Sequence, residues 1–217
     1  GATEDQTVEA GLHRRPDDGR SPYPFFRDRV MFPIADRRGR TIAFGGRLMS
    51  DAKAAKYVNS PDTPLFDKGR NLYNFGAARQ ASFDSGQLVV AEGYMDVIAL
   101  SQAGITAAVA PLGTALTEDQ IRALWRLAAE PVLCFDGDTA GQRAAGRAAE
   151  RALPLLQPGK SLRFALLPAG EDPDSLIGRQ GAGAMRQLLE AAQPLSDVMW
   201  RLEAGASPVD TPERRAD

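Results

Sequence analysis

The chain has 217 residues, of which 43% are hydrophobic and 25% are charged, as is ordinary for a folded soluble protein. No apolar run is long enough for a membrane-spanning helix and the polar N-terminal sequence is unlike a signal peptide, so we expect a cytoplasmic protein that does not bind membranes. The single cysteine, Cys134, excludes an internal disulfide, and the single histidine, His13, argues against a zinc site.

The net charge of −2 is unevenly distributed. Residues 20–80 contain twelve Lys or Arg against five Asp or Glu, whereas residues 81–217 contain twelve against eighteen. The basic segment is suited to binding a polyanion and the acidic segment to collecting cations. Solvated faces of opposite sign would give the same pattern, so charge alone does not decide between the two readings.

The N-terminal part of the sequence predicts little regular structure beyond one hairpin. Residues 1–28 are expected to be irregular. Residues 29–34 and 41–44 read as two strands joined by a turn, and the pair Gly45–Gly46 is expected to end the hairpin. Residues 50–80 are polar and interrupted by proline and glycine, which predicts a loop-rich extension with little core of its own.

From residue 87 onward, short apolar runs alternate with helical segments. Runs of this kind are typical of strands buried on both faces of a sheet. The predicted strands are 88–91, 106–110, 132–135 and 162–167, and the predicted helices are 95–103, 117–129, 139–153 and segments near 173–203. This alternation indicates parallel βαβ units. The last dozen residues are expected to be frayed.

Acidic residues follow three of these four predicted strands. They are Glu92 and Asp96 after the first, Asp136 and Asp138 after the third, and Asp172 and Asp174 after the fourth. The carboxyl ends of parallel strands share one edge of the sheet, so these side chains can converge. Paired carboxylates bind hard divalent ions such as Mg²⁺ or Mn²⁺, and such ions can activate a hydroxyl and stabilise a phosphate during in-line displacement.

Several of these acids also have a purely structural interpretation. Asp138 could cap the helix that begins near Thr139, and Asp172 could cap a helix that begins at Pro173. Asp96 could serve only as a first-turn acid that interacts with the helix dipole. Capping and metal binding do not exclude each other, so both interpretations stay open for these residues.

The acidic motifs resemble a known superfamily. The sequence Glu92-Gly93 after one strand and Asp136-Gly137-Asp138 after a later one resembles the Toprim domain, which primases, topoisomerases and some nucleases share. The surrounding sequence resembles bacterial DnaG-type DNA primases more specifically. The matching blocks span residues 25–178 and are Arg29–Ile34, Phe44–Arg47, Lys56–Pro61, Phe66–Tyr73, Val90–Val97, Phe135–Gly141 and Leu167–Asp174.

The resemblance implies an α/β fold: a Toprim domain, with a Rossmann-like parallel sheet of about four strands and flanking helices, plus a small basic α+β N-terminal subdomain. The implied divisions are a partial basic subdomain over 1–80, the Toprim catalytic domain over 81–178 and a truncated helical extension over 179–217. A complete primase also has a zinc-binding domain and a domain that binds the replicative helicase. Neither has a counterpart in this sequence, which is therefore expected to be a fragment that contacts the helicase only through an absent domain.

The resemblance also implies an activity and its residues. The activity is that of a nucleotidyltransferase that makes short RNA primers from ribonucleoside triphosphates on single-stranded DNA during replication, with Mg²⁺ or Mn²⁺ and, in this fragment, no zinc. Glu92, Asp136 and Asp138 are the implied catalytic and metal-binding acids, Asp172 and Asp174 the further ligands, and Asp96 a secondary acid. The implied nucleotide- and DNA-binding residues are Arg29, Arg47, Lys56, Asn59 and Lys68.

The sequence also allows other interpretations. Glu92 could act in proton transfer in place of metal binding. The aromatic residues Tyr57, Phe66 and Tyr73 could stack on bases, although core packing is the simpler expectation. The chain could be another Toprim enzyme, either a topoisomerase or a nuclease, or a nucleotide-binding module without activity.

Overall fold

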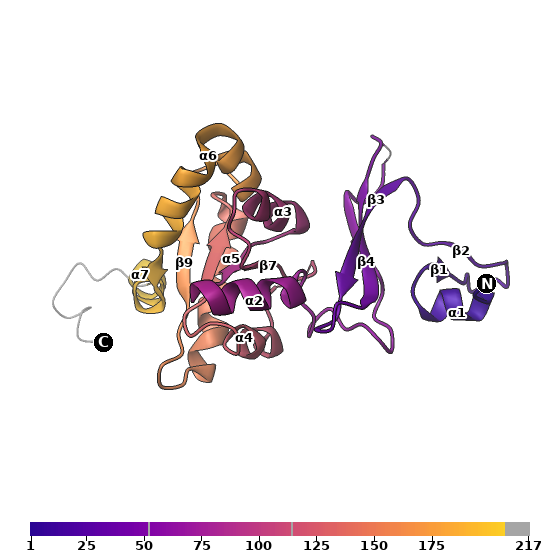
Figure 1. The fold of residues 1–217 in the computed structure, drawn as a ribbon, viewed down its shortest axis with the longest axis horizontal. Helices are drawn as coiled ribbons and strands as arrows, with labels where there is room; N and C mark the ends of the chain where they lie inside the picture. Colours follow the sequence, from indigo (N-terminus) through magenta and orange to yellow (C-terminus); the bar gives the residue numbers. More distant parts are fainter. Residues whose placement is uncertain (52, 114, 207–217) are drawn as a thin grey trace.

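The computed structural model describes residues 1–51, 53–113 and 115–206. In this part of the chain, a small N-terminal element, a three-stranded antiparallel sheet and a larger α/β unit follow one another (Figure 1). The predicted α/β class is confirmed. No helix in the described ranges is long and apolar enough to cross a membrane.

The antiparallel sheet contains the predicted hairpin. It consists of β3 (Arg29–Ala35), β4 (Thr41–Leu48) and β5 (Tyr57–Asn59), in the order β3-β4-β5. The prediction that Gly45–Gly46 ends the hairpin is wrong, because β4 continues through both glycines. A Cβ atom at Gly45 would lie 2.5 Å from the ring of Tyr94. These glycines therefore mark a close approach between two segments of the protein and not a turn.

The larger unit is built on a sheet of five strands in the order β10-β9-β8-β6-β7. The strands are β6 (Val89–Val90), β7 (Ala108–Val109), β8 (Val132–Phe135), β9 (Arg163–Leu166) and β10 (Gln193–Pro194). The first four pair in parallel, as predicted, while β10 pairs with β9 in the antiparallel direction at the edge. The sequence does not predict the edge strand, because two residues are too short to show a strand pattern.

Helices cover both faces of this sheet. One face packs against α2 (Phe75–Ser85), α4 (Glu118–Leu124), α5 (Thr139–Ala152) and α7 (Leu195–Ala206). The other packs against α3 (Tyr94–Gln102) and α6 (Pro173–Glu190). Helix α4 ends earlier than predicted, and a 3₁₀ turn (Leu153–Leu155) follows α5. Cys134 is buried in the core, as expected, and burial raises the pKa of its thiol.

Two predictions of irregular structure are corrected. Residues 1–28 contain α1 (Glu4–Glu9), β1 (His13–Arg14) and β2 (Tyr23–Pro24). Helix α2 lies partly within the segment predicted to be loop-rich, so the suggested boundary between residues 80 and 81 falls inside a helix. The division into domains is otherwise still a prediction. Residues 207–217, most of the segment expected to be frayed, lie outside the described ranges.

A separate hydrophobic cluster joins the hairpin sheet to the α/β unit. Its buried members are Phe32, Ile34, Ala43, Phe66, Tyr94 and Leu112, and we call it the junction core. The ring of Tyr94 stacks on Phe32 with centroids 5.2 Å apart and meets Tyr73 edge-on at 4.8 Å. Core packing is thus the correct reading for Phe66, which is buried. The junction core fixes where the basic hairpin stands relative to the parallel sheet.

Candidate metal centre

The carboxyl ends of β6 and β8 form the centre of the candidate site. These strands are neighbours in the sheet, but the helices that follow them, α3 and α5, cover opposite faces. The chain therefore leaves the two strand ends in opposite directions and opens a crevice between them, which is where open α/β sheets bind ligands. Glu92 and Asp136 lie at this point, and the backbone N–H of Asp136 donates to Glu92 Oε1 at 2.9 Å.

The loop after β8 is held tightly by backbone packing. A Cβ atom at Gly137 would lie 1.8 Å from the carbonyl oxygen of Pro168, and one at Gly141 would lie 2.2 Å from that of Asp136. The N–H of Gly137 also donates to the carbonyl of Glu171 at 3.0 Å. Only glycine fits between these atoms, so the sequence Asp-Gly-Asp fixes the backbone on which Asp136 and Asp138 are carried.

Burial and mutual repulsion change the acidity of the central carboxylates. Burial raises the pKa of Asp136 to about 6, and the charges of Glu92, Asp172 and Asp138 add to the effect. Burial likewise raises the pKa of Asp96 to about 7, reinforced chiefly by Asp136 and opposed by the hydrogen bond from the N–H of Gly93. Several acids thus lie within electrostatic reach of one another and resist ionisation, which a bound cation would relieve.

The acids that have structural interpretations do cap helices. Asp138 Oδ1 accepts from the N–H of Gly141 at 2.7 Å, and Asp172 Oδ1 accepts from that of Ser175 at 2.7 Å. Asp96 Oδ2 accepts from the N–H of Gly93 at 2.8 Å at the start of α3. Each of these bonds uses one oxygen, so capping leaves the second oxygen of each carboxylate available for a ligand.

The donor set fits a hard divalent ion. Asp136 Oδ1 is buried and has no hydrogen-bond partner among the described residues, as expected of an atom that is completed by a ligand. The surrounding donors are carboxylate oxygens, which Mg²⁺ and Mn²⁺ prefer. No three acidic, histidine or cysteine side chains in the described ranges lie close enough to hold one ion together. The acids are gathered at one edge but do not form a single coordination shell.

The acids after β9 divide into two kinds. Asp174 is exposed in the first turn of α6. Burial raises the pKa of Tyr57, and the charges of Asp96, Asp172 and Asp174 add to the effect. Glu171 instead is buried, pairs with Arg179 and accepts a hydrogen bond from the Ser175 hydroxyl. Asp172 and Asp174 therefore lie within electrostatic reach of Tyr57 on the basic hairpin, while Glu171 is occupied within the protein.

Of the predicted binding residues, Arg47 and Lys56 are the best placed to meet a ligand. Arg47 lies on β4 opposite Tyr57 in the strand register, and its charge acts on the Tyr57 hydroxyl in opposition to the acids. The ammonium of Lys56 lies 5.9 Å from the centre of the exposed Tyr57 ring. Arg29 instead donates through Nη1 to the carbonyls of Gly46 and Lys56, at 3.2 and 3.3 Å. Its side chain therefore links β3 to β4 and to the residue that precedes β5.

Asn59 and Lys68 occupy more internal positions. The side chain of Asn59 accepts a hydrogen bond from the Tyr94 hydroxyl and donates to the carbonyl of Leu112 at 2.8 Å, so both ends of its amide are engaged. Lys68 is half-buried, and its backbone carbonyl accepts from Gln120 Nε2 at 3.0 Å. Lys68 therefore lies next to the first turn of α4, whereas Asn59 links the hairpin sheet to the α/β unit.

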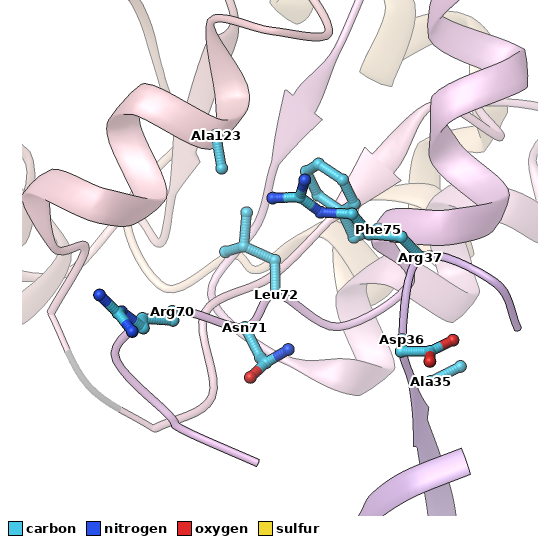
Figure 2. A pocket seen from close by; sticks show the side chains of 8 residues that line it. All are labelled: Ala35, Asp36, Arg37, Arg70, Asn71, Leu72, Phe75 and Ala123. Carbon is cyan, nitrogen blue, oxygen red and sulfur yellow. The ribbon is translucent and has the colours of Figure 1, made fainter. Parts of the chain in front are cut away.

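A small pocket of about 30 Å³ lies between the hairpin turn, residues 70–72, α2 and α4 (Figure 2). The Arg37 guanidinium lies over the Phe75 ring, 5.5 Å from its centre. Arg70 pairs with Asp119 at 3.1 Å, and Asp36 pairs with Arg40 at 2.7 Å. These charges are engaged with the protein, and none of the predicted catalytic acids lines the pocket, so it is separate from the candidate metal centre.

Tyr94 is the residue near the site whose role the sequence does not reveal. It follows Glu92 by two positions, is buried in the junction core and bonds to Asn59. Burial raises the pKa of its hydroxyl far above the ordinary value, so it stays protonated and can donate. The glycines at Gly45 and Gly46 are the available signal, since paired glycines inside a strand often mark a close approach by another segment.

Comparison with known proteins identifies both parts of the chain. Residues 1–79 match the family model of the N-terminal domain of the DNA primase catalytic core, and residues 86–165 match a Toprim domain. A DNA primase from Pseudomonas aeruginosa is 53% identical over 195 residues, which cover 89% of this chain and 29% of that protein. The chain therefore spans about a third of the length of the curated relatives it matches.

Solved structures agree with the sequence comparison. A crystal structure of a DNA primase domain from Pseudomonas aeruginosa superposes with a TM-score of 0.93 at 49% identity, covering 100% of this chain and 68% of that one. A DnaG primase catalytic domain bound to single-stranded DNA superposes with a TM-score of 0.89 at 46% identity, covering 98% of this chain and 68% of the other.

Proposed function

This chain belongs to the family of DnaG-type DNA primases, and we propose that it carries the centre at which such an enzyme joins ribonucleotides on single-stranded DNA. The observation that supports this most directly is the hydrogen bond from the Asp136 N–H to Glu92 across the crevice, beside the unpartnered Asp136 Oδ1. This hydrogen bond links Glu92 and Asp136, which belong to the two sequence motifs that Toprim primases share.

The proposed reaction is nucleotidyl transfer. The 3′ oxygen of one nucleotide attacks the α-phosphorus of the next, the bond from that phosphorus to the β-phosphate oxygen breaks, and pyrophosphate leaves with the electron pair. The hydroxyl proton passes to Glu92 or to solvent. A divalent ion bound at the acids would lower the pKa of the attacking hydroxyl and neutralise charge on the phosphates. Because no three of these acids in the described ranges lie close enough to hold one ion together, Glu92, Asp136 and Asp138 would share more than one such ion, with Asp172 and Asp174 as further ligands and Asp96 behind them.

The hairpin sheet supplies the complementary positive charge. Arg47 and Lys56 are proposed to contact phosphates of the template or of the ribonucleoside triphosphate, since cationic side chains form the strongest hydrogen bonds to such groups. The ring of Tyr57 is exposed beside Lys56 and is within electrostatic reach of Arg47 and of the acids, so a base can stack on it. Arg29 and Asn59 are proposed to act indirectly, by positioning the hairpin residues Arg47, Lys56 and Tyr57. Lys68 stays a candidate for contact with nucleotide or DNA. Family membership also supports a cytoplasmic location.

Primer synthesis on a single-stranded template with labelled ribonucleotides and Mg²⁺ or Mn²⁺ tests the proposal. Asp136→Asn is expected to lower the rate by at least about 100-fold, because loss of a catalytic charge costs several kcal/mol in the transition state. A full rate in Asp136→Asn would contradict the assignment. Relaxation or cleavage of supercoiled DNA in place of primer synthesis would favour another Toprim enzyme, and nucleotide binding without either activity would favour a binding module.

A further inference from the structure

Gln120, in the first turn of α4, is fully buried although glutamine is a polar residue. Its Oε1 accepts a hydrogen bond from the N–H of Thr117 at 3.0 Å, which completes the capping box at the start of this helix. Its Nε2 donates to the carbonyl of Lys68 at 3.0 Å and to that of Asn71 at 2.8 Å. The capping box accounts for the oxygen of the amide alone, so the nitrogen has a separate role.

Two further contacts attach residues 68–71 to the first turn of α4. The hydroxyl of Thr117 donates to the carbonyl of Gly69 at 2.6 Å, and the guanidinium of Arg70 pairs with Asp119 at 3.1 Å. The ion pair is exposed to solvent, and pairs of this kind contribute little to stability. The hydrogen bonds from α4 to the backbone carbonyls of the segment are therefore its main attachment.

Lys68 combines a fixed backbone with a free ammonium group. Its N–H donates to Asp62 Oδ1 at 3.0 Å, and its carbonyl accepts from Gln120. No side chain in the described part of the chain forms a hydrogen bond or an ion pair with its ammonium. Phe66, two positions earlier, is buried in the junction core, so the segment lies where the hairpin sheet meets the α/β unit. Because a lysine side chain is long and flexible, the position of its backbone decides which anions its ammonium can reach.

We propose that Gln120 is a positioning residue, which holds the backbone of Lys68 so that the ammonium meets a phosphate group of the ligand. This rests on the proposed function, in which Lys68 is a candidate for contact with nucleotide or DNA. A phosphate anion is common to a nucleoside triphosphate and to the template backbone, and a lysine ammonium binds either as a point charge. Gln120 is buried and touches neither ligand, so it acts only through Lys68.

Gln120→Met keeps the approximate size of the side chain and removes both donors. It is expected to weaken the binding of magnesium ATP or of a single-stranded oligonucleotide by about threefold to tenfold, because the ligand must then also order the segment that carries Lys68. Lys68→Gln should weaken binding of the same ligand by about tenfold or more, since a charge-assisted hydrogen bond is lost. Separate calorimetric titrations with the two ligands show whether the phosphate belongs to nucleotide or to template.

The double variant that combines Gln120→Met with Lys68→Gln separates positioning from a general effect on the fold. If Gln120 acts through Lys68, the double variant should bind the ligand as weakly as Lys68→Gln alone, so the two losses do not add. Ser82→Ala is the matched control, because Ser82 is also buried and donates to a backbone carbonyl, that of Leu127, at 3.2 Å. This control should lower the melting temperature by about 2–4 °C and leave both affinities unchanged.

Additive losses in the double variant would overturn the inference, and so would affinities for both ligands in Gln120→Met that equal those of the unsubstituted protein. If Gln120→Met does not fold, Thr117→Val removes the neighbouring hydrogen bond to Gly69 and replaces it in the same set of variants. Coupled losses of affinity in a protein that makes no primers would contradict the proposed function and uphold the positioning role of Gln120.

Discussion

The hydroxyl of Tyr94 donates a hydrogen bond to Asn59 Oδ1 and so joins the hairpin sheet to the helix that begins beside Glu92. The amide of Asn59 continues the link by donating to the carbonyl of Leu112 at 2.8 Å. Gly45 makes room for the Tyr94 ring on the hairpin side. The distance between basic hairpin and acidic strand ends is therefore set by a buried polar link inside a hydrophobic junction.

Tyr94→Phe is expected to weaken this link without disturbing the acids. The substitution removes one buried donor and leaves Asn59 Oδ1 short of a partner, which should lower the free energy of unfolding by about 1–2 kcal/mol. The apparent KM for nucleotide should rise more than kcat falls, because the hairpin loses its fixed position while the acids keep theirs. Denaturant unfolding and steady-state kinetics measure the two effects. Tyr23→Phe, at an exposed tyrosine, should change neither.

Gly137→Ala is expected to displace the loop that carries Asp136 and Asp138. The added methyl group would meet the Pro168 carbonyl at 1.8 Å, and overpacking of this kind costs about 1–3 kcal/mol. Divalent-ion affinity should fall along with stability. Gly178→Ala in α6 is the matched control, because nothing lies within 4 Å of the added atom and alanine favours a helix. Equal melting temperatures for the two variants would contradict the packing account.

The acidic cluster predicts how stability depends on pH in the presence of a chelator. The pKa of Asp136 is raised to about 6 and that of Asp96 to about 7, from an ordinary value of 3.8. Since the folded state holds these protons more tightly, their contribution to stability is fully present below about pH 4 and is lost as the pH rises through 6 to 7. The melting temperature should therefore decline between about pH 4 and pH 7, and Mn²⁺ should reduce this decline. Asp136→Asn should show a weaker dependence, and an unchanged slope would show that Asp136 is not a cause of the decline.

The strand ends can be predicted because their pattern is local. Glu92 and Asp136 each follow a short apolar run, and the parallel alternation of strands and helices implies that such ends share an edge. The caps at Asp138 and Asp172 are equally visible, since each precedes a helical segment and the second is followed by Pro173. These features depend on neighbours in the chain, and the structure confirms the caps.

The features of the fold and the site that the sequence does not predict depend on contacts between residues that are distant in the chain. Helix α2 has no side-chain cap, because Asn74 adopts a left-handed conformation and donates its amide to the carbonyl of Ala108 instead. The usual start signal is therefore missing from the sequence. The amide of Asn59 is a plausible nucleotide contact in the sequence, but the fold turns it toward Tyr94 and Leu112.

The assignment of the metal centre is tested most directly by comparing the Mn²⁺ affinities of the unsubstituted protein and of Asp136→Asn. The affinity is measured from the paramagnetic resonance signal of free Mn²⁺. We expect Asp136→Asn to bind Mn²⁺ at least about tenfold more weakly, since it loses one charged ligand of a hard-ion site. Its melting temperature in chelator should be equal or higher, because a repelled carboxylate is removed. Equal Mn²⁺ affinity in the two proteins would show that the crevice between β6 and β8 is not the metal centre.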